Sequence, residues 1–234
     1  MKNKDASSSD ATELDVIAAI RDRRSVRAFL NQAVPTDTIH KILEAARFAP
    51  SGVNTQPWHV AIIGPKHREK ISAAIVKART NNVPENPDYQ YYPTEWVEPY
   101  KSRRKACGLA LYGALNIAID DKEKRKAQWY RNYYFFHAPV ALIFYIDANM
   151  HKGSWMDMGM FIQNVMLSAR GFGLETCPQA ALAEYPDIIR DHLNLPKSMH
   201  IVCGMALGYA DWSAPVNQYR TDREEVSTFT VQYD

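Results

Sequence analysis

Residues 154–171 place the tightest limit on how this chain can be arranged in space. Apolar side chains recur there at helical spacing and occupy almost every side of the helix. The positions are Met158, Phe161, Ile162, Val165, Met166 and Ala169. Because a helix that is apolar all round is unfavourable in water, this segment must be central or lie in a subunit interface. Its polar residues Asp157, Gln163 and Asn164 are expected to cap or to line that interface.

Residues 139–146 form the second strong pattern, a short continuous apolar run rich in β-branched and aromatic side chains. Such a run predicts a strand covered on both faces in the middle of a sheet. Further patterns predict strands at residues 58–63 and 199–207 and helices at residues 13–22, 36–48, 66–79 and 185–195. Because helices and strands mix irregularly, we expect an α+β fold in which helices flank a central mixed, mainly antiparallel sheet.

A chain of 234 residues suits one compact domain. We expect a disordered tail at residues 1–12 and a single domain at residues 13–234, which ends in an arm at residues 215–234. The composition changes sharply to Asn, Pro, Tyr and Trp between residues 81 and 100. A long aromatic stretch of this kind is more often a lid or a dimer arm than a plain surface insertion.

Charge and cysteine content exclude several classes of partner. The chain has 28 Lys and Arg against 26 Asp and Glu, so no general field attracts nucleic acid or an anionic membrane. The longest apolar runs are far shorter than the roughly 20 residues that span a bilayer. Cys107, Cys177 and Cys203 lie far apart without paired spacing, which is typical of a reducing compartment. We therefore expect a soluble, cytoplasmic protein.

Several nucleotide-binding and catalytic motifs are absent. GFGLET at residues 171–176 lacks the third glycine of the dinucleotide fingerprint GxGxxG, and no Walker GxxxxGK[ST] motif occurs. The seven histidines show no HxxxH or HExxH spacing, and no GxSxG elbow is present. A nicotinamide cofactor would therefore bind only transiently and not in a Rossmann-type site. No metal site is expected.

The first candidate site is the basic turn RRSVR at residues 23–27. Arg23, Arg24 and Arg27 bring three guanidinium groups, and Ser25 brings a hydroxyl, to a junction between a helix and an extended segment. Guanidinium forks match phosphate oxygens, and a turn exposes backbone N–H groups to the same anion. Taken alone, such a run is more often a solvated basic surface.

The second candidate is the loop APSGVNTQPW at residues 49–58. Pro50, Ser51 and Gly52 stop a helix, and the side-chain amides of Asn54 and Gln56 follow before an expected strand. Amides in such a loop need hydrogen-bond partners. They either belong to a satisfied turn or point at the edge of a flat heteroaromatic ring.

These segments carry a resemblance to a known family. The ordered landmarks are RRSVRAF at residues 23–29, APSGVNTQPW at residues 49–58, GFGLETCP at residues 171–178 and LGYAD at residues 207–211, with Arg220 and Arg223 beyond. Together they resemble the nitroreductase family from about residue 14 to residue 223. The likeness is weakest at about residues 81–132, a variable lid or insert in which members of the family differ most in length. It implies a nitroreductase-like fold and an intertwined homodimer.

The resemblance also implies FMN at the homodimer interface, in a pocket built from both chains. One chain would supply Arg23, Arg24, Ser25, Arg27, Arg220 and Arg223, and the other would supply Pro50, Ser51, Gly52, Asn54 and Gln56. The stretch Pro178, Gln179 and Ala180 would cross one face of the isoalloxazine ring. Arg27 would stabilise the negative charge that two-electron reduction leaves near flavin N1.

The implied function is a flavin-dependent oxidoreductase without a catalytic acid or base side chain, since the flavin carries the chemistry. NADH or NADPH would give a hydride to the flavin, and a small planar acceptor such as a nitroaromatic or a quinone would receive it by a ping-pong mechanism. Relatives of this fold also perform reductive dehalogenation, enone reduction or breakdown of the flavin. The alternative from another class is a non-catalytic flavin-binding or anion-binding protein, which predicts no turnover with NAD(P)H.

Two further features have alternative interpretations. Aromatic side chains in and after the insert are Tyr89, Tyr91, Tyr92, Trp96, Tyr100, Trp129 and Tyr130. They either stack on a planar acceptor or pack in the core and the interface. Cys177 lies beside the proposed flavin segment but has no paired cysteine, so we expect a small buried hydrophobe without a redox role.

Overall fold

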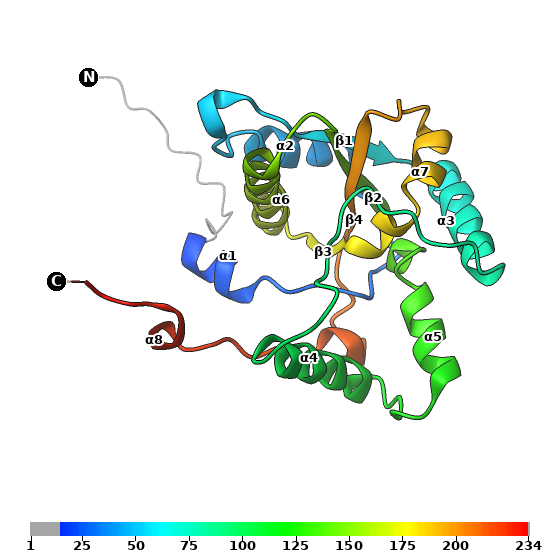
Figure 1. Ribbon diagram of the computed structural model, residues 1–234, viewed down its shortest axis with the longest axis vertical. Helices are drawn as coiled ribbons and strands as arrows, with labels where there is room; N and C mark the ends of the chain where they lie inside the picture. The colour runs from blue at the N-terminus through cyan, green and yellow to red at the C-terminus, as the bar shows by residue number, and fades with distance from the viewer. Residues whose placement is uncertain (1–14, 234) are drawn as a thin grey trace, which may run out of the picture.

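The computed structural model describes residues 15–233, which form a four-stranded sheet between two layers of helices (Figure 1). The strands are β1 (His59–Ile63), β2 (Val140–Asp147), β3 (Glu175–Gln179) and β4 (Met199–Gly208). They pair in the order β1-β2-β4-β3, and each pairing is antiparallel. The expected α+β fold is confirmed. Parallel pairing is found at the isolated bridge between Ser25 and Thr176.

Helices occupy both faces of this sheet. The α-helices are α1 (Val16–Asp22), α2 (Thr36–Ala46), α3 (Pro65–Thr80), α4 (Tyr100–Ala114), α5 (Lys122–Tyr130), α6 (Lys152–Gly171), α7 (Pro186–Leu193) and α8 (Val226–Phe229). Short 3-10 turns are η1 (Gly52–Asn54), η2 (Phe135–His137), η3 (Ala180–Glu184) and η4 (Pro215–Asn217). Figure 1 shows α2 and α6 on one side of the sheet and α3 and α7 on the other.

β2 lies inside the sheet and is buried on both faces, as its apolar run predicts. Leu142 and Phe144 pack into the core cluster that contains residues of α2 and α6. Ala141 and Ile143 pack into the opposite cluster, with residues of α3 and α7. Alternation along one strand therefore divides the apolar interior into two cores.

Only one side of α6 packs into the core. Phe161 is buried, stacks on Trp58 with ring centroids 4.9 Å apart, and meets Phe144 of the sheet at 6.2 Å. Met156 and Met160, on the outer side of the helix, are exposed. The helix is therefore apolar all round because it has a core face and a second apolar face that the chain itself leaves uncovered.

The insert and the C-terminal arm lie outside the two cores. Residues 81–99 are irregular, and α4 and α5 follow within the insert. α4 has no buried residue, and Figure 1 shows it at the edge of the molecule, away from the sheet. The arm begins in the interior, where Val216 and Asn217 are buried, and then runs outward through the exposed α8. Residues 1–12, the expected tail, lie outside the described residues.

Within residues 15–233, no helix combines the length and the apolar character needed to cross a membrane.

Candidate functional site

The predicted basic turn lies directly after α1, beside β3. The backbone N–H of Val26 donates to the carbonyl of Thr176 at 3.0 Å, and Ser25 forms the parallel bridge to the same residue. Val26 is fully buried. These contacts fix the backbone of the turn to the sheet, so its arginines extend from a rigid base.

Asn217 of η4 fixes the turn from the other side. Its side-chain Oδ1 accepts from the backbone N–H of Arg27 at 2.8 Å, and its Nδ2 donates to the carbonyls of Ala28 and Asp211, each at 2.8 Å. The backbone carbonyl of Asn217 accepts from Nη1 of Arg24 at 3.1 Å. One buried residue of the C-terminal arm thus positions two of the predicted arginines.

Arg23, Arg24, Arg220 and Arg223 form a cluster of positive charge at this turn. Burial lowers the pKa of Arg23, and the neighbouring Arg223 lowers it further. Burial also lowers the pKa of Arg24, and Arg220 adds to that shift. Asp22 partly balances Arg220, with 3.2 Å between Oδ1 and Nη2. Guanidinium groups that repel one another in this way favour binding of an anion with several charges.

Arg24 has a buried donor that lacks a partner. Its Cζ lies 5.0 Å from the centroid of the Trp212 ring, which holds the guanidinium in place. Its Nε is buried and has no hydrogen-bond partner among the described residues. A buried polar group left unpaired destabilises the fold by about 1–3 kcal/mol, so this N–H is suited to a bound acceptor such as a phosphate oxygen.

Arg27, Pro178, Gln179 and Ala180 line a cavity of about 1000 Å³. Nη1 of Arg27 donates to the Ser25 carbonyl at 3.1 Å and to the Tyr219 hydroxyl at 3.0 Å, which fixes the cation at the cavity wall. The Gln179 amide donates to the carbonyl of Asn132 at 2.7 Å. Its Oε1 is buried without a partner in the described part of the chain.

The insert supplies the aromatic wall of the same cavity. Of the aromatic residues singled out above, Tyr89, Tyr91, Tyr92 and Trp129 line it, and Tyr112 of α4 joins them. Trp96, Tyr100 and Tyr130 are not among the lining residues. The hydroxyl of Tyr89 donates to the carbonyl of Val202 at 2.7 Å, so this ring is also anchored to the sheet. Four of the seven aromatic residues therefore lie where a ligand in this cavity could contact them.

The predicted loop at residues 50–56 is built as a separate, strained turn. The backbone N–H of Gly52 donates to Oδ2 of the buried Asp157 at 3.2 Å, and the N–H of Gln56 donates to Oγ of Ser51 at 3.0 Å. Val53, Asn54 and Gln56 have φ angles of 44°, 59° and 49°. A β-branched residue at positive φ is strained, which is characteristic of sites where a fixed backbone serves a ligand.

This loop does not meet the basic turn within one chain. Figure 1 shows the loop after α2 near the upper end of α6, whereas the turn after α1 lies below the lower end of that helix. Val53 is 98% exposed, and Gly52, Asn54 and Gln56 are exposed too. The chain therefore brings Arg27 together with residues 178–180. It presents Pro50, Ser51, Gly52, Asn54 and Gln56 on a different surface.

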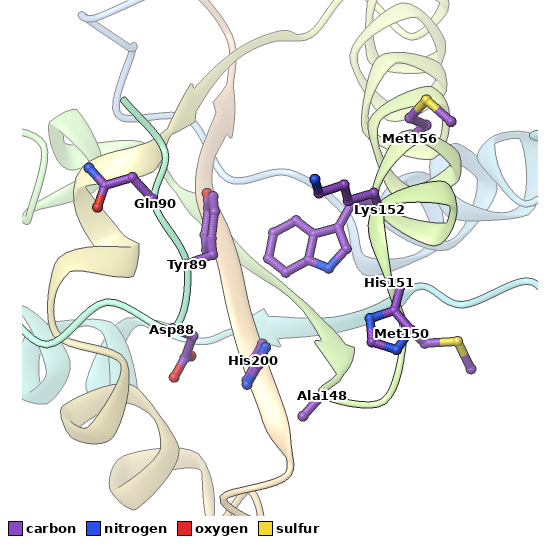
Figure 2. Close-up of a pocket in the computed structure, with 10 residues that line it drawn as sticks. Asp88, Tyr89, Gln90, Ala148, Met150, His151, Lys152, Met156 and His200 are labelled. Carbon is purple, nitrogen blue, oxygen red and sulfur yellow. The ribbon is translucent and has the colours of Figure 1, made fainter. Parts of the chain in front are cut away.

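A second cavity of about 590 Å³ lies between the start of the insert and the amino end of α6 (Figure 2). Tyr89 and Trp155 face each other there, with ring centroids 4.4 Å apart. Asp88 turns from the cavity to Arg190, at 2.6 Å, and to the N–H of Ile201, at 2.8 Å. None of the predicted cofactor-binding residues lines this cavity. The described residues also hold no group of three or more His, Cys, Asp or Glu side chains placed to bind a metal.

Sequence reasoning missed Asn217, and it named Asp157 and Asn164 without finding the contacts through which they support the site. Asn217 has no motif around it, and 190 positions separate it from Arg27. Asp157 accepts the hydrogen bond of the Gly52 N–H. In the sequence, the only indication of this role is a single carboxylate within an otherwise apolar helix. The Asn164 amide likewise donates to the carbonyl of Ala46 at 3.4 Å, so both residues fix the end of α2 and the loop after it.

The profile of the Nitroreductase family matches residues 20–209, and the chain belongs to that family. A 4-nitrobenzoate reductase from Pseudomonas putida is 41% identical over 216 residues, which cover 92% of this chain and 94% of that protein. A nitrobenzene nitroreductase from Ectopseudomonas oleovorans is 41% identical over 214 residues, which cover 91% and 94%. The expected family is therefore confirmed.

A solved structure gives the same result for the fold. The FMN and NADPH-dependent nitroreductase NfnB from sphigopyxis sp. strain HMH superposes with a TM-score of 0.92 at 36% identity. The match covers 94% of this chain and 100% of that one. The sheet, its helical layers and the insert therefore have counterparts over nearly the whole length of a known flavoenzyme.

Proposed function

We propose that this protein is a homodimeric FMN-dependent oxidoreductase that uses NADPH to reduce nitroaromatic compounds. The observation that carries the proposal is the arginine cluster of the basic turn, together with a large cavity that is lined by Arg27, residues 178–180 and aromatic side chains. Relatives that match over nine-tenths of the chain are a 4-nitrobenzoate reductase and a nitrobenzene nitroreductase. The similar NfnB structure is of an FMN and NADPH-dependent enzyme.

The residues present fit FMN. Its phosphate requires concentrated positive charge, which the four clustered arginines offer, and the unpaired Nε of Arg24 requires an acceptor. Ser25 would add a hydroxyl to the phosphate site. Residues 178–180 would contact the flavin ring, and the ring edge requires amides such as that of Asn54, whose side chain has no hydrogen bond among the described residues. When bound, FMN supplies the two-electron transfer between nicotinamide and nitro compound.

The remaining side chains of the site would orient the bound groups and shield them from water. Arg27, fixed by Tyr219 and the Ser25 carbonyl, places a permanent positive charge where negative charge develops on reduction. Asn217 orients Arg27 and Arg24 together. The insert at residues 81–132 would act as a lid, since its aromatic side chains cover the cavity and exclude water from a planar acceptor.

We infer the dimer from apolar surface that one chain leaves exposed. Val16 and Ile17 of α1 are 66% and 59% exposed, and Met156 of α6 is 70% exposed. Val53 of the strained loop is more exposed still. Large apolar side chains exposed to this extent on neighbouring elements are typical of a protein interface. A partner packed there would also bring the loop at residues 50–56 to the cofactor site of the first chain.

We also propose the cytoplasm as the compartment. Cys107, Cys177 and Cys203 are all free thiols, and Cys177 and Cys203 are buried at separate places in the sheet. A reducing compartment suits a protein whose thiols have no covalent partners.

The visible spectrum of the purified protein is the first test. We expect a yellow protein that bleaches when NADPH is added without oxygen and recovers its colour when 4-nitrobenzoate or nitrobenzene follows. A colourless protein that takes up no added FMN would contradict the proposal and favour an anion-binding role for the arginines.

Subunit complementation tests the two-chain site. Arg27→Ala and Asn54→Ala homodimers should each retain FMN poorly and turn over slowly. Co-expression of the two variants under different affinity tags should yield a mixed dimer with one intact site and one doubly altered site. We expect about half of the wild-type flavin content and rate in that mixed dimer. A mixed dimer no better than its parents would rule out a site shared between chains.

A further inference from the structure

The lining of the large cavity carries more positive than negative charge. Its cations are Arg27, Lys101, Arg104, Lys105 and Arg125, and its carboxylates are Glu85 and Glu184. Arg79, which does not line the cavity, pairs with both carboxylates, with 3.2 Å between its Nη1 and Oε2 of Glu184. Glu184 also accepts from the Tyr133 hydroxyl at 2.5 Å. The two carboxylates of the lining thus share one cationic partner outside it, whereas the five cations of the lining leave positive charge in excess.

Four of these cations form one surface, which we call the cationic wall. It consists of Lys101, Arg104 and Lys105 on α4 and Arg125 on α5. No carboxylate among residues 15–233 lies within ion-pair distance of any of them. The charge of the wall is therefore available to a ligand in the cavity.

Aromatic rings hold the two arginines of the wall in place. Cζ of Arg104 lies 5.1 Å from the centroid of the Trp96 ring, and Cζ of Arg125 lies 4.6 Å from that of Tyr112. Arg125 also donates to the carbonyl of Ile119 at 2.8 Å. A ring orients a guanidinium without cancelling its charge, and leaves N–H groups free for an anion.

The wall and the aromatic surface lie side by side in one cavity. Burial raises the pKa of Tyr92, and the neighbouring Arg104 opposes that shift. Tyr91 packs edge-on against Tyr92, with ring centroids 4.6 Å apart, and both rings line the cavity with the wall. A flat ring that stacks there would therefore have its substituent within reach of a guanidinium.

We propose that the cationic wall selects aromatic substrates that carry a negative group, such as the carboxylate of a nitrobenzoate, over neutral ones of the same shape. Arg104 is the principal specificity-determining residue, because it combines a fixed orientation with contact to the aromatic surface. This inference rests on the proposed function, since the cavity is the acceptor site of that enzyme. The 2'-phosphate of NADPH is a second anion of suitable chemistry, and the experiment separates the two.

The test compares 4-nitrobenzoate with 4-nitrobenzamide, which have nearly the same shape and differ in charge. The ratio of their kcat/KM values should favour 4-nitrobenzoate in the wild-type enzyme. Arg104→Gln should lower that ratio about tenfold, the value of a charge-assisted hydrogen bond in a partly open site. Arg103→Gln is the matched control, because Arg103 is on the same helix, does not line the cavity and pairs with Glu224 at 2.7 Å. Its ratio should equal that of the wild type.

A binding measurement separates this inference from the proposed function. Calorimetric titration with benzoate and with benzamide needs no turnover, so it reports on the wall even if neither nitro compound is reduced. Benzoate should bind more tightly than benzamide, and Arg104→Gln should remove the difference. Equal binding by the wild type, or equal losses for both substrates in Arg104→Gln, would overturn the inference. So would an unchanged substrate ratio with a raised KM for NADPH relative to NADH, because the wall would then serve the 2'-phosphate.

Discussion

Asn217 is the residue on which the geometry of the basic turn most depends. Its side chain satisfies the Arg27 N–H and the carbonyls of Ala28 and Asp211, and it is only 1% exposed. Buried groups deprived of such partners are destabilising, whereas the same loss at a surface is nearly neutral.

Asn217→Ala should therefore lower the free energy of unfolding by about 2–4 kcal/mol. It should also weaken FMN binding, because the turn that carries Arg24 and Arg27 loses its anchor. Denaturant unfolding and a flavin fluorescence titration measure the two effects. Ser227→Ala, a change at an exposed residue of α8 in the same arm, is the control and should alter neither. Full stability in the Asn217 variant would contradict the assignment of its hydrogen bonds.

Individual cysteine residues are also expected to differ in reactivity. Burial raises the pKa of the Cys177 thiol, and it raises the pKa of Cys203 to about 12. The thiolate is the nucleophilic form, so both should be inert at neutral pH. Cys107 is exposed on α4.

Brief treatment of the native protein with iodoacetamide should therefore add one label per chain, at Cys107. Mass spectrometry after digestion identifies the site, and a Cys107→Ser variant should remain unlabelled. A label on Cys177 in the native protein would revive a redox role beside the flavin segment.

At the scale of elements, periodic burial decided what the sequence could predict. β2 and α6 were predicted because their side chains meet the core at regular spacing. β3 was missed because Glu175, Thr176 and Pro178 give it no apolar run. It is buried through pairing with β4 and through the ion pair between Glu175 and Arg170, at 2.7 Å. α4 and α5 were missed because neither packs a regular apolar face into the interior.

The residues of the site also divide into those that the sequence could predict and those that it could not. The basic turn and the loop at residues 49–58 are contiguous motifs, so their residue types were visible in the sequence. The cationic wall was not, because Arg104 and Arg125 come from different helices and meet only across a cavity. Long-range partners such as Asn217 leave no local signal at all.

The end of β4 packs closely against the residue before β2, and this contact gives a prediction at the scale of elements. A Cβ added at Gly208 would lie 2.5 Å from Cδ and 2.7 Å from Cγ of Pro139, a ring that cannot rotate away. Gly208→Ala should therefore destabilise the protein by about 1–3 kcal/mol through overpacking. Gly171→Ala, at the end of α6 with open space around it, should leave stability close to that of the wild type. Thermal unfolding of the two variants checks this, and equal midpoints would contradict it.

At the scale of the whole molecule, the predicted site residues lie on two separate surfaces. The basic turn lies near the lower end of α6, and the strained loop lies near its upper end (Figure 1). Apolar residues of α1 and α6 are left exposed as well. The dimer that we propose would cover that apolar surface and complete two equivalent cofactor sites in one step.

In the dimer that we propose, the separation of the loop from the basic turn would make cofactor retention depend on protein concentration. A lone chain would offer only part of the proposed contact surface for FMN, so dissociation of the dimer would also release the flavin. By mass action, added FMN would then hold the dimer together on dilution. Fluorescence of released flavin should rise, and sedimentation should slow, over the same range of dilution. An excess of FMN should move both midpoints to lower protein concentration by the same factor.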